Sequence, residues 1–429
     1  MNRREFLKAS AGTGMYLCAS SAMSQTHKAT NLVVISKFKA AKKFQPIILP
    51  VSIGGKTYKF MVATGFASTV FDQSLENLLG KPKEEISTLD DNGDEKIIKI
   101  YYAPNATVGK MNLSKGGCVR TADLSGLRDL TGINIRGVLG MAFLRKYVMQ
   151  VNYDTGEVTF MKPDYQEHKE WGIISKMLKP PRGTRGIPII AGRLYNKISV
   201  PFEIDTSIPL TGVVSSTVFK TLVNEKDVKK HVRQTFINAK GNKSTDTYGR
   251  FEDLEISKQK HKGLVLKQGN FMGNGGALGI GFLSRHIVTF DFPGLKLYLK
   301  KGKAFDTTDK IDMSGMKLLY AENPNPVKKG RVMLVSEVEV GNPVSSDEPK
   351  NKNPQGESPA EGAGIKPGDY LFKLNGVKLS KKSLSQVRDF LKSKPDTKVK
   401  VVFVRRVKKA DGSIVDQGLQ NTLTLKEVL

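Results

Sequence analysis

The sequence predicts a mainly β protein in which two similar units are followed by a third unit of different composition. Its 429 residues include 41 glycines and 19 prolines among scattered valines and isoleucines, which favours many short strands over long helices. Apolar residues make up 39% and charged residues 25% of the chain, as in soluble globular proteins. A chain of this length can bury several separate cores.

Two pairs of similar segments indicate an internal duplication. The segment FMVATGFASTVFDQSL, which begins at Phe60, resembles FEIDTSIPLTGVVSSTVF, which begins at Phe202. The segment GVLGMAFLRKYVMQVNYDTGEVTF, which begins at Gly137, resembles GALGIGFLSRHIVTFDFPGLKLYL further along the chain. Both pairs are separated by about 140 residues, which is the signature of a repeated unit. We therefore expect residues 45–165 and 185–300 to be two copies of one domain.

Each copy is expected to consist mostly of strands. Residues 46–63, PIILPVSIGGKTYKFMVA, alternate as two strands around a Gly-Gly turn. Residues 92–113 and 240–263 are expected to form exposed hairpins in corresponding positions of the two copies. Each copy should then close with a short helix, at Phe143–Leu144 or Phe282–Leu283, followed by a final strand.

These features resemble the retropepsin-like aspartic proteases, in the bacterial form with two lobes fused in one chain. The resemblance covers residues 45–300, and two kinds of motif carry it. One is the Asp-Thr-Ser at 205–207 together with the Ala-Thr-Gly at 63–65. The other is a block of the form Gly-x-Leu-Gly-Met/Ile-x-Phe-Leu, which occurs once in each copy. The resemblance implies two acid-protease β-barrel lobes in a pepsin-like bilobal arrangement.

The chemistry of an aspartic protease needs two carboxylates a hydrogen bond apart. The ionised one takes a proton from the attacking water, and the protonated one donates to the scissile carbonyl. Asp205 matches the family position in the second copy, but Ala63 stands where the first copy should supply its acid. Four residues that match the family loops are expected to support these two positions: Thr64, Gly65, Thr206 and Ser207.

Three alternatives for Asp205 remain open at this point. It could be a loop aspartate that bonds to its own backbone in a turn. It could still act as the catalytic group of an active endopeptidase. It could also pair with the Asp205 of a second chain, if two chains exchanged lobes. Because losing the dyad removes most useful turnover, we expect a pseudoprotease.

The sequence after residue 305 resembles a PDZ domain over residues 311–429. Residues 341–357 are rich in Pro, Asn, Ser and charge, and we predict that they are a disordered insert. Residues 383–393 are expected to form an amphipathic helix, with a strand after it. Four further motifs carry the resemblance: Ser358-Pro359-Ala360, Ala363-Gly364-Ile365, Pro367-Gly368-Asp369 and Leu374-Asn375-Gly376.

The PDZ resemblance implies that a chain end or an internal strand binds beside the second strand and the helix. In this family, backbone N–H groups of a short apolar loop hold the terminal carboxylate. The candidates for that loop are Gly315, Met316, Lys317 and Leu318. The alternative is that residues 315–318 are simply the beginning of the first strand.

The N-terminal segment, residues 1–24, has the order of a targeting signal. Arg3 and Arg4 are followed by Phe-Leu-Lys, then a mildly apolar run, then small residues. This order resembles the bacterial twin-arginine export signal, with cleavage expected after Ala22 or Ser24. We therefore expect a periplasmic or otherwise exported protein. No later stretch reaches the run of about 18 apolar residues that spans a bilayer.

The formal net charge is +27, from 68 Lys and Arg against 41 Asp and Glu. Such a field attracts polyanions, but no nucleic-acid module accompanies it, so specific nucleic-acid binding is not expected. The five histidines show no metal spacing, and cleavage would leave Cys118 as a single cysteine. We expect no metal, no cofactor and no internal disulfide.

These observations predict an exported pseudoprotease that binds extended peptides or unfolded protein segments, with the PDZ module as a second contact. An active aspartic-type endopeptidase that relies on Asp205 is the first alternative. The second alternative is an envelope scaffold that its positive charge holds to an anionic surface.

Overall fold

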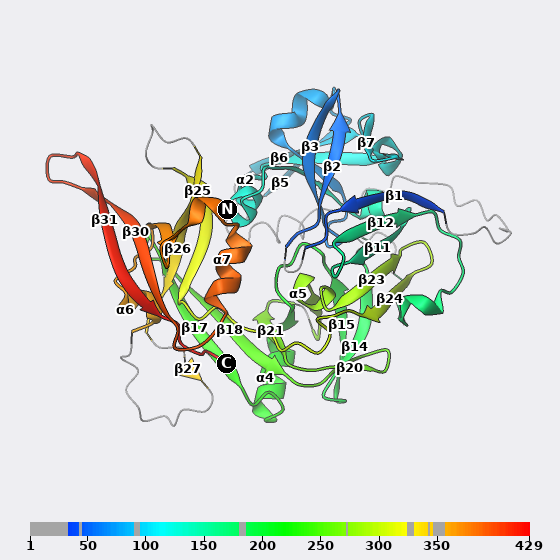
Figure 1. Cartoon of the computed structure of the whole chain (residues 1–429). Helices are drawn as coiled ribbons and strands as arrows, with labels where there is room; N and C mark the ends of the chain where they lie inside the picture. Colours follow the sequence, from blue (N-terminus) through cyan, green and yellow to red (C-terminus); the bar gives the residue numbers. More distant parts are fainter. Residues whose placement is uncertain are drawn as a thin grey trace.

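The computed structural model describes residues 33–42, 45–89, 95–179, 186–271, 273–323, 330–341, 344–345 and 357–429. The expected export signal at residues 1–24 lies outside the described residues, and so does most of the expected insert at 341–357. The described part is mainly β, as the sequence predicts, and its strands form three sheets (Figure 1).

The first unit is a sheet in the strand order β5-β6-β9-β4-β10-β3-β2-β7-β8. Its elements are β2 (Ile48–Ile53), β3 (Lys56–Val62), β4 (Thr69–Asp72), η1 (Gln73–Leu78), β5 (Glu84–Leu89), β6 (Glu95–Tyr102), β7 (Ala106–Val108), β8 (Met111–Asn112), η2 (Leu113–Gly116), β9 (Cys118–Ala122), α2 (Ser125–Thr131), β10 (Ile135–Leu139) and α3 (Met141–Leu144).

The second unit repeats this order strand for strand, as β17-β18-β21-β16-β22-β15-β14-β19-β20. Parallel pairs match parallel pairs: β3 with β10 corresponds to β15 with β22, and β4 with β9 corresponds to β16 with β21. Its elements are β14 (Ile189–Leu194), β15 (Ile198–Ile204), β16 (Gly212–Ser215), α4 (Ser216–Asn224), β17 (His231–Asn238), β18 (Lys243–Phe251), β19 (Leu254–Ile256), β20 (Gln259–His261), β21 (Leu264–Gly269), β22 (Gly276–Leu278) and α5 (Ile280–Leu283).

The hairpin that begins each unit shows why the local sequence folds in this way. Residues of β2 alternate between buried and exposed, which is the pattern of a half-buried strand. The turn to β3 uses Gly54 and Gly55, with φ of +56° and +75°, a conformation that glycine adopts without steric cost. In the second unit Tyr195 and Asn196 take the corresponding turn, with φ of +49° and +53°.

A further sheet joins the two units in the order β1-β12-β11-β23-β24-β13. At its centre Val148 pairs with Asp291 and Asn152 pairs with Ile287, so the register is symmetric about the Gln150–Thr289 pair. Gln150 Nε2 donates to Thr289 Oγ1 over 2.9 Å. Its elements, with the nearby η3, are β1 (Val34–Lys39), β11 (Val148–Asn152), β12 (Glu157–Met161), η3 (Lys169–Trp171), β13 (Ile173–Lys176), β23 (His286–Asp291) and β24 (Lys296–Lys301).

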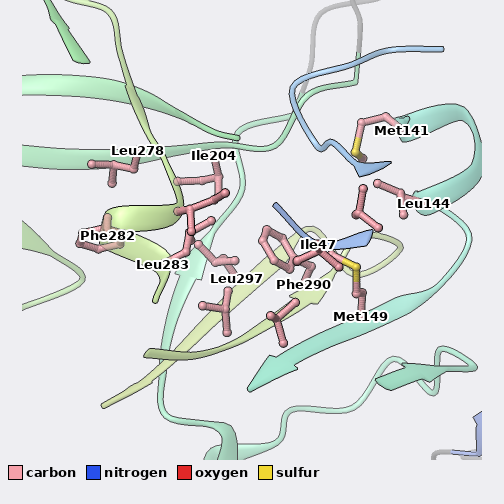
Figure 2. Close-up of a cluster of buried hydrophobic side chains, with 14 of the residues drawn as sticks. Ile47, Met141, Leu144, Met149, Ile204, Leu278, Phe282, Leu283, Phe290 and Leu297 are labelled. Atoms are coloured by element: carbon pink, nitrogen blue, oxygen red, sulfur yellow. The ribbon is translucent and has the colours of Figure 1, made fainter. Parts of the chain in front are cut away.

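One apolar core runs through both units and this joining sheet (Figure 2). The close-up shows Leu144 of the first unit and Leu283 of the second unit in the same cluster as Met149 and Phe290 of the joining sheet. Each of these side chains is fully buried, and burial of one such side chain stabilises a fold by about 1.5–3 kcal/mol. The two units therefore share one continuous core and pack against each other as a single body.

The C-terminal unit has a core of its own, which extends from Met313 to Leu425. The predicted helix at 383–393 is present as α7, and the side chain of Ser383 caps its first turn. The elements of this unit are β25 (Met316–Glu322), β26 (Arg331–Glu339), β27 (Val344–Ser345), α6 (Pro359–Gly362), β28 (Tyr370–Leu374), β29 (Val377–Lys378), η4 (Leu379–Lys381), α7 (Leu384–Leu391), β30 (Lys398–Lys408) and β31 (Ile414–Thr424).

The C-terminal unit is fastened to both β units. Strand β26 pairs antiparallel with β17, so that the sheet of the second unit continues into the C-terminal unit (Figure 1). On the other side, Arg331 donates to the backbone carbonyl of Arg128 in α2 over 2.9 Å and forms an ion pair with Asp129. The ring of Tyr320 lies directly against Gly132, where a Cβ atom would overlap it.

Candidate polypeptide-binding cleft

The structure brings the two predicted loops together at the interface of the β units. Thr64 N donates to Thr206 Oγ1 over 3.2 Å, and Thr206 N donates to Thr64 Oγ1 over 3.1 Å. Thr64 Oγ1 in turn donates to the carbonyl of Ile204 over 2.6 Å, and Thr206 Oγ1 donates to the carbonyl of Val62 over 2.9 Å. Each of these four bonds has its counterpart in the other loop.

Ala63 and Asp205 occupy equivalent places in these loops. Ala63 N donates to the carbonyl of Leu139, and Asp205 N donates to the carbonyl of Leu278, both over 3.0 Å. Each is the last residue before a tight turn, because its own carbonyl accepts the N–H of the residue three positions later. Ala63 therefore stands where a symmetric protein would carry a second aspartate.

The Asp205 carboxylate is buried, with 4% of the residue exposed. Its Oδ1 accepts hydrogen bonds from Gly65 N at 3.2 Å, Ser207 N at 2.8 Å and Ser207 Oγ at 2.7 Å. A Cβ on Gly65 would lie 2.3 Å from Asp205 Oδ2, so glycine is required for this approach. Asp205 therefore does accept a backbone N–H of its own loop, that of Ser207, as the alternative of a turn-forming aspartate predicts.

The side chain of Ala63 belongs to a small cluster of buried apolar side chains. The residue itself is fully buried. The other members of the cluster are Met61, Phe66, Val70, Leu124, Leu127, Ile135 and Val138. The shared-proton chemistry of a carboxylate dyad needs two acids, and this pair of loops supplies one.

The nearest acid further along the first unit is held by other contacts. Asp72 is buried at the end of β4 and forms ion pairs with Arg128 and Arg136. Burial opposes ionisation of Asp72, but hydrogen bonds from Ser74 and Arg128 outweigh it and lower the pKa of the carboxyl below its ordinary value. A carboxylate tied to two arginines in this way is a structural anion.

The Asp205 loop opens on a cleft of about 2600 Å³ that also includes the inner face of the C-terminal unit. The walls are formed by α2, by the β17–β18 hairpin, and by β25 and α7, which face the two β units in Figure 1. Pockets for small molecules usually measure about 300–1,000 Å³. The size of this cleft suits a polypeptide segment better than a small metabolite.

The segment that leads into the C-terminal unit is fixed along this cleft by Asp309. Thr211 Oγ1 donates to Asp309 Oδ2 over 2.6 Å, and Val265 N donates to the same oxygen over 2.9 Å. Arg285 Nη2 donates to Asp309 Oδ1 over 2.7 Å. Because Thr211 belongs to the loop that follows Asp205, these bonds hold the connection to the C-terminal unit beside the Asp205 loop.

The predicted residues 315–318 lie at the start of β25. Gly315 is buried, with φ of +71°, and Met316, Lys317 and Leu318 are the first residues of the strand. The structure therefore confirms the alternative that this segment begins the first strand of the unit, directly after a glycine turn, while its role in holding a carboxylate stays a prediction. The opposite edge of β25 from β26 faces α7, and we call the space between them the β25–α7 groove.

Side chains of the chain itself cross the β25–α7 groove. Arg388 Nη2 donates to the carbonyl of Leu318 over 2.9 Å. The hydroxyl of Tyr320 accepts the backbone N–H of Leu384 over 3.0 Å and donates to the carbonyl of Lys382 over 3.3 Å. Sequence reasoning missed Arg388, because its role depends on which face of α7 turns toward the strand.

Two acidic residues at the end of this groove were also missed. Asp312 Oδ1 accepts from Ser314 N at 2.9 Å and from Ser314 Oγ at 2.5 Å. Glu339 is 1% exposed and accepts from Gln234 Nε2 over 3.0 Å. Burial raises the pKa of Asp312, and burial raises the pKa of Glu339 to about 7, with Asp312 and Glu361 adding repulsion.

Among the described residues, no cluster of three or more His, Cys, Asp or Glu side chains is suited to hold a metal ion. No helix in the described part of the chain is long and apolar enough to cross a membrane.

Comparison with known proteins identifies one part of the chain. Residues 353–405 match the PDZ domain family, so the chain contains a PDZ domain in its C-terminal unit, as the sequence predicts. The matched range includes α6, β28, β29, η4 and α7, and most of β30. No curated protein matches the chain. PDZ domains bind peptide ends by adding a strand to a sheet edge, which is consistent with peptide partners for this unit.

Proposed function

We propose that this chain binds extended polypeptide segments, which lie in the β25–α7 groove and continue along the cleft toward Asp205. The single observation that supports this most strongly is the continuity of the cleft, which Asp205 and the groove residues line together. A PDZ domain supplies strand-addition binding, and the long walls of the cleft supply further surface for the same segment. One ligand would then contact all three units.

We infer further that the two β units descend from a retropepsin-like aspartic protease and have lost its catalysis. The duplicated strand order and the reciprocal bonds of Thr64 and Thr206 support this relationship. Ala63 supports the loss of activity, because its methyl group can neither ionise nor form a hydrogen bond. The cleft would keep the affinity of a protease for extended chains without cutting them.

Binding is tested with the full chain and a fluorescently labelled, permanently unfolded protein as the probe. Ser385 lines the cleft on α7, so Ser385→Trp should fill the groove and weaken binding by about tenfold or more. Val377→Trp is the matched control, because Val377 is 48% exposed on β29 and does not line the cleft. Equal affinity of the two variants would contradict the proposed binding site.

The loss of catalysis is tested with the same probe under peptidase conditions. The wild-type chain should leave the probe intact, and Ala63→Asp should acquire cleavage that a transition-state inhibitor of aspartic proteases blocks. Cleavage by the wild-type chain that disappears in Asp205→Asn would instead establish the active endopeptidase. A thermal melt of each variant shows whether it is folded before either result is read.

A further inference from the structure

The end of the β25–α7 groove holds a carboxylate that belongs to the chain itself. A PDZ domain ordinarily captures the terminal carboxylate of its ligand with backbone N–H groups of a turn at this end of the groove. Here the N–H and the hydroxyl of Ser314 both donate to Asp312 Oδ1. The N–H of Met316 donates to Ser314 Oγ over 3.3 Å. Side chains of the turn thus already accept two of its N–H groups.

A second acid lies behind the same turn. A Cβ on Gly315 would be 3.3 Å from Glu339 Oε2, so this carboxyl group packs directly against the glycine. Glu339 Oε1 is buried and has no hydrogen-bond partner among the described residues. Burial outweighs the charges of Arg388 and Lys392 in setting the pKa of Asp312, and Lys317 pairs with Asp246 and Glu337.

A ligand carboxylate at this place would meet an unfavourable environment. It would have to displace Asp312 from Ser314, and the displaced carboxylate would remain close to the new one. Two like charges at such a distance cannot both ionise without a cost, and a buried carboxylate that loses its donors is costly as well. A segment without a terminal carboxylate meets neither cost.

The cleft continues beyond the turn. Residues 307–312 and the β25–α7 groove line the same cleft, and Asp309 holds this segment to Thr211 next to the Asp205 loop. A ligand that ended at the turn would stop short of Asp205. A ligand that passed the turn would continue along the cleft toward it.

We propose that the β25–α7 groove of this chain selects internal segments of a polypeptide over free C-terminal ends, because Asp312 occupies the place of the ligand carboxylate. This inference rests on the proposed function, since it assumes that the groove binds polypeptides. It assigns Asp312 as the residue that determines specificity. The ligand class is an extended segment from within an unfolded chain.

The test compares three forms of one pool of short random peptides on the full-length protein. The first form ends in a free carboxylate and the second in a C-terminal amide. The third carries a C-terminal Gly-Ser extension, so that the random segment no longer lies at the chain end. Binding is measured by competition against the labelled unfolded protein. For the wild-type chain, the amide and the extended form should bind equally, and both should bind about tenfold more tightly than the free carboxylate.

Two variants of Asp312 show whether this residue is the cause. Asp312→Ala removes the carboxylate from the turn. It should raise the affinity for the free-carboxylate form about fivefold to tenfold and leave the affinity for the amide form unchanged. Asp312→Asn keeps the side-chain volume and removes only the charge, so a smaller gain of the same sign is expected. Asp411→Ala is the matched control, because Asp411 makes the same two bonds, to the N–H and hydroxyl of Ser413, in the β30–β31 hairpin.

The outcomes separate this inference from the proposed function. If the free-carboxylate form binds best to the wild-type chain, the groove binds peptides and only the preference for internal segments is wrong. The same conclusion follows if Asp312→Ala leaves the ratio of the forms unchanged. If no form competes with the labelled protein, the proposed function fails, and this inference fails with it.

Discussion

Thr64 and Thr206 exchange hydrogen bonds across the two β units, each hydroxyl accepting the backbone N–H of the other residue. Each hydroxyl also donates to the strand that leads to the opposite loop. Both residues are fully buried, so water cannot replace any of these bonds. These four hydrogen bonds place Ala63 and Asp205 in equivalent positions and fix the two loops relative to each other.

Replacing either threonine by valine should destabilise the protein to a similar extent. Each change keeps the shape of the side chain but leaves one N–H and one carbonyl of the other unit without a partner. The expected cost is about 2–4 kcal/mol for either variant. Urea unfolding of Thr64→Val and Thr206→Val measures it, and Thr107→Val on the exposed face of β7 is the control. A large cost on one side only would contradict the symmetry.

Gly65→Ala should destabilise the Asp205 loop by about 1–3 kcal/mol, because the new methyl group would overlap the carboxylate. Combining it with Asp205→Ala should recover most of this loss, since the overlapping atoms are then removed. Thermal melts of both single variants and the double variant measure the coupling. Gly418→Ala in β31 is the control, because no atom lies within 4 Å of its added Cβ. Additive costs would show that the contact is absent.

Glu339→Gln should stabilise the protein at alkaline pH and change little in acid. Burial raises the pKa of Glu339 from 4.5 to about 7, so the folded state binds a proton that the unfolded state has lost. Its contribution to stability is therefore present below pH 4.5 and is lost as the pH rises through 7. We expect a gain of about 1–3 kcal/mol at pH 8 and less than about 1 kcal/mol at pH 5. The measurement is the urea midpoint of both proteins at the two pH values, and a gain that does not depend on pH would contradict it.

His261 and His286 should make the protein less stable in acid. Burial lowers the pKa of His261 to about 3 and that of His286 to about 4, below the ordinary value of 6.5. The unfolded state then binds protons that the folded state excludes, so stability is lost as the pH falls below 6.5. Each histidine should cost about 2 kcal/mol at pH 5.

The variant His261→Phe tests this source of acid sensitivity, because the ring lies among Phe282, His286 and Phe305 and its nitrogens have no partner among the described residues. Between pH 7 and pH 5, the unfolding free energy of the variant should fall less than that of the wild-type chain. The urea midpoint at each pH measures the decline. Parallel curves for the wild-type chain and the variant would exclude His261 as a source.

The export proposal makes a prediction about residues 1–24 alone. Fused to a reporter enzyme, this segment should direct the reporter out of the bacterial cytoplasm, because its paired arginines are followed by Phe-Leu-Lys. Replacing both Arg3 and Arg4 by lysine keeps the charge and should abolish export. Cell fractionation measures the result, and export that survives the double replacement would exclude the twin-arginine route.

Features that depend on neighbouring residues could be predicted from the sequence. The hairpin around Gly54 and Gly55 follows from strand alternation and two glycines. Helix α7 follows from the spacing of its apolar residues and the cap at Ser383. The duplication was visible because two long segments repeat at one separation, and this repeat also placed Ala63 opposite Asp205.

Only the tertiary structure decided which residues far apart in the chain come into contact. Strand β26 pairs with β17, Asp309 accepts a hydrogen bond from Thr211, and Glu339 packs behind Gly315. No local sequence pattern predicts any of these contacts. Side-chain periodicity specifies which face of an element is buried, but not which distant edge or turn will cover it. The sequence by itself therefore determined the units and the correspondence of Ala63 with Asp205, while the packing of those units created the shared cleft and put Asp312 at its turn.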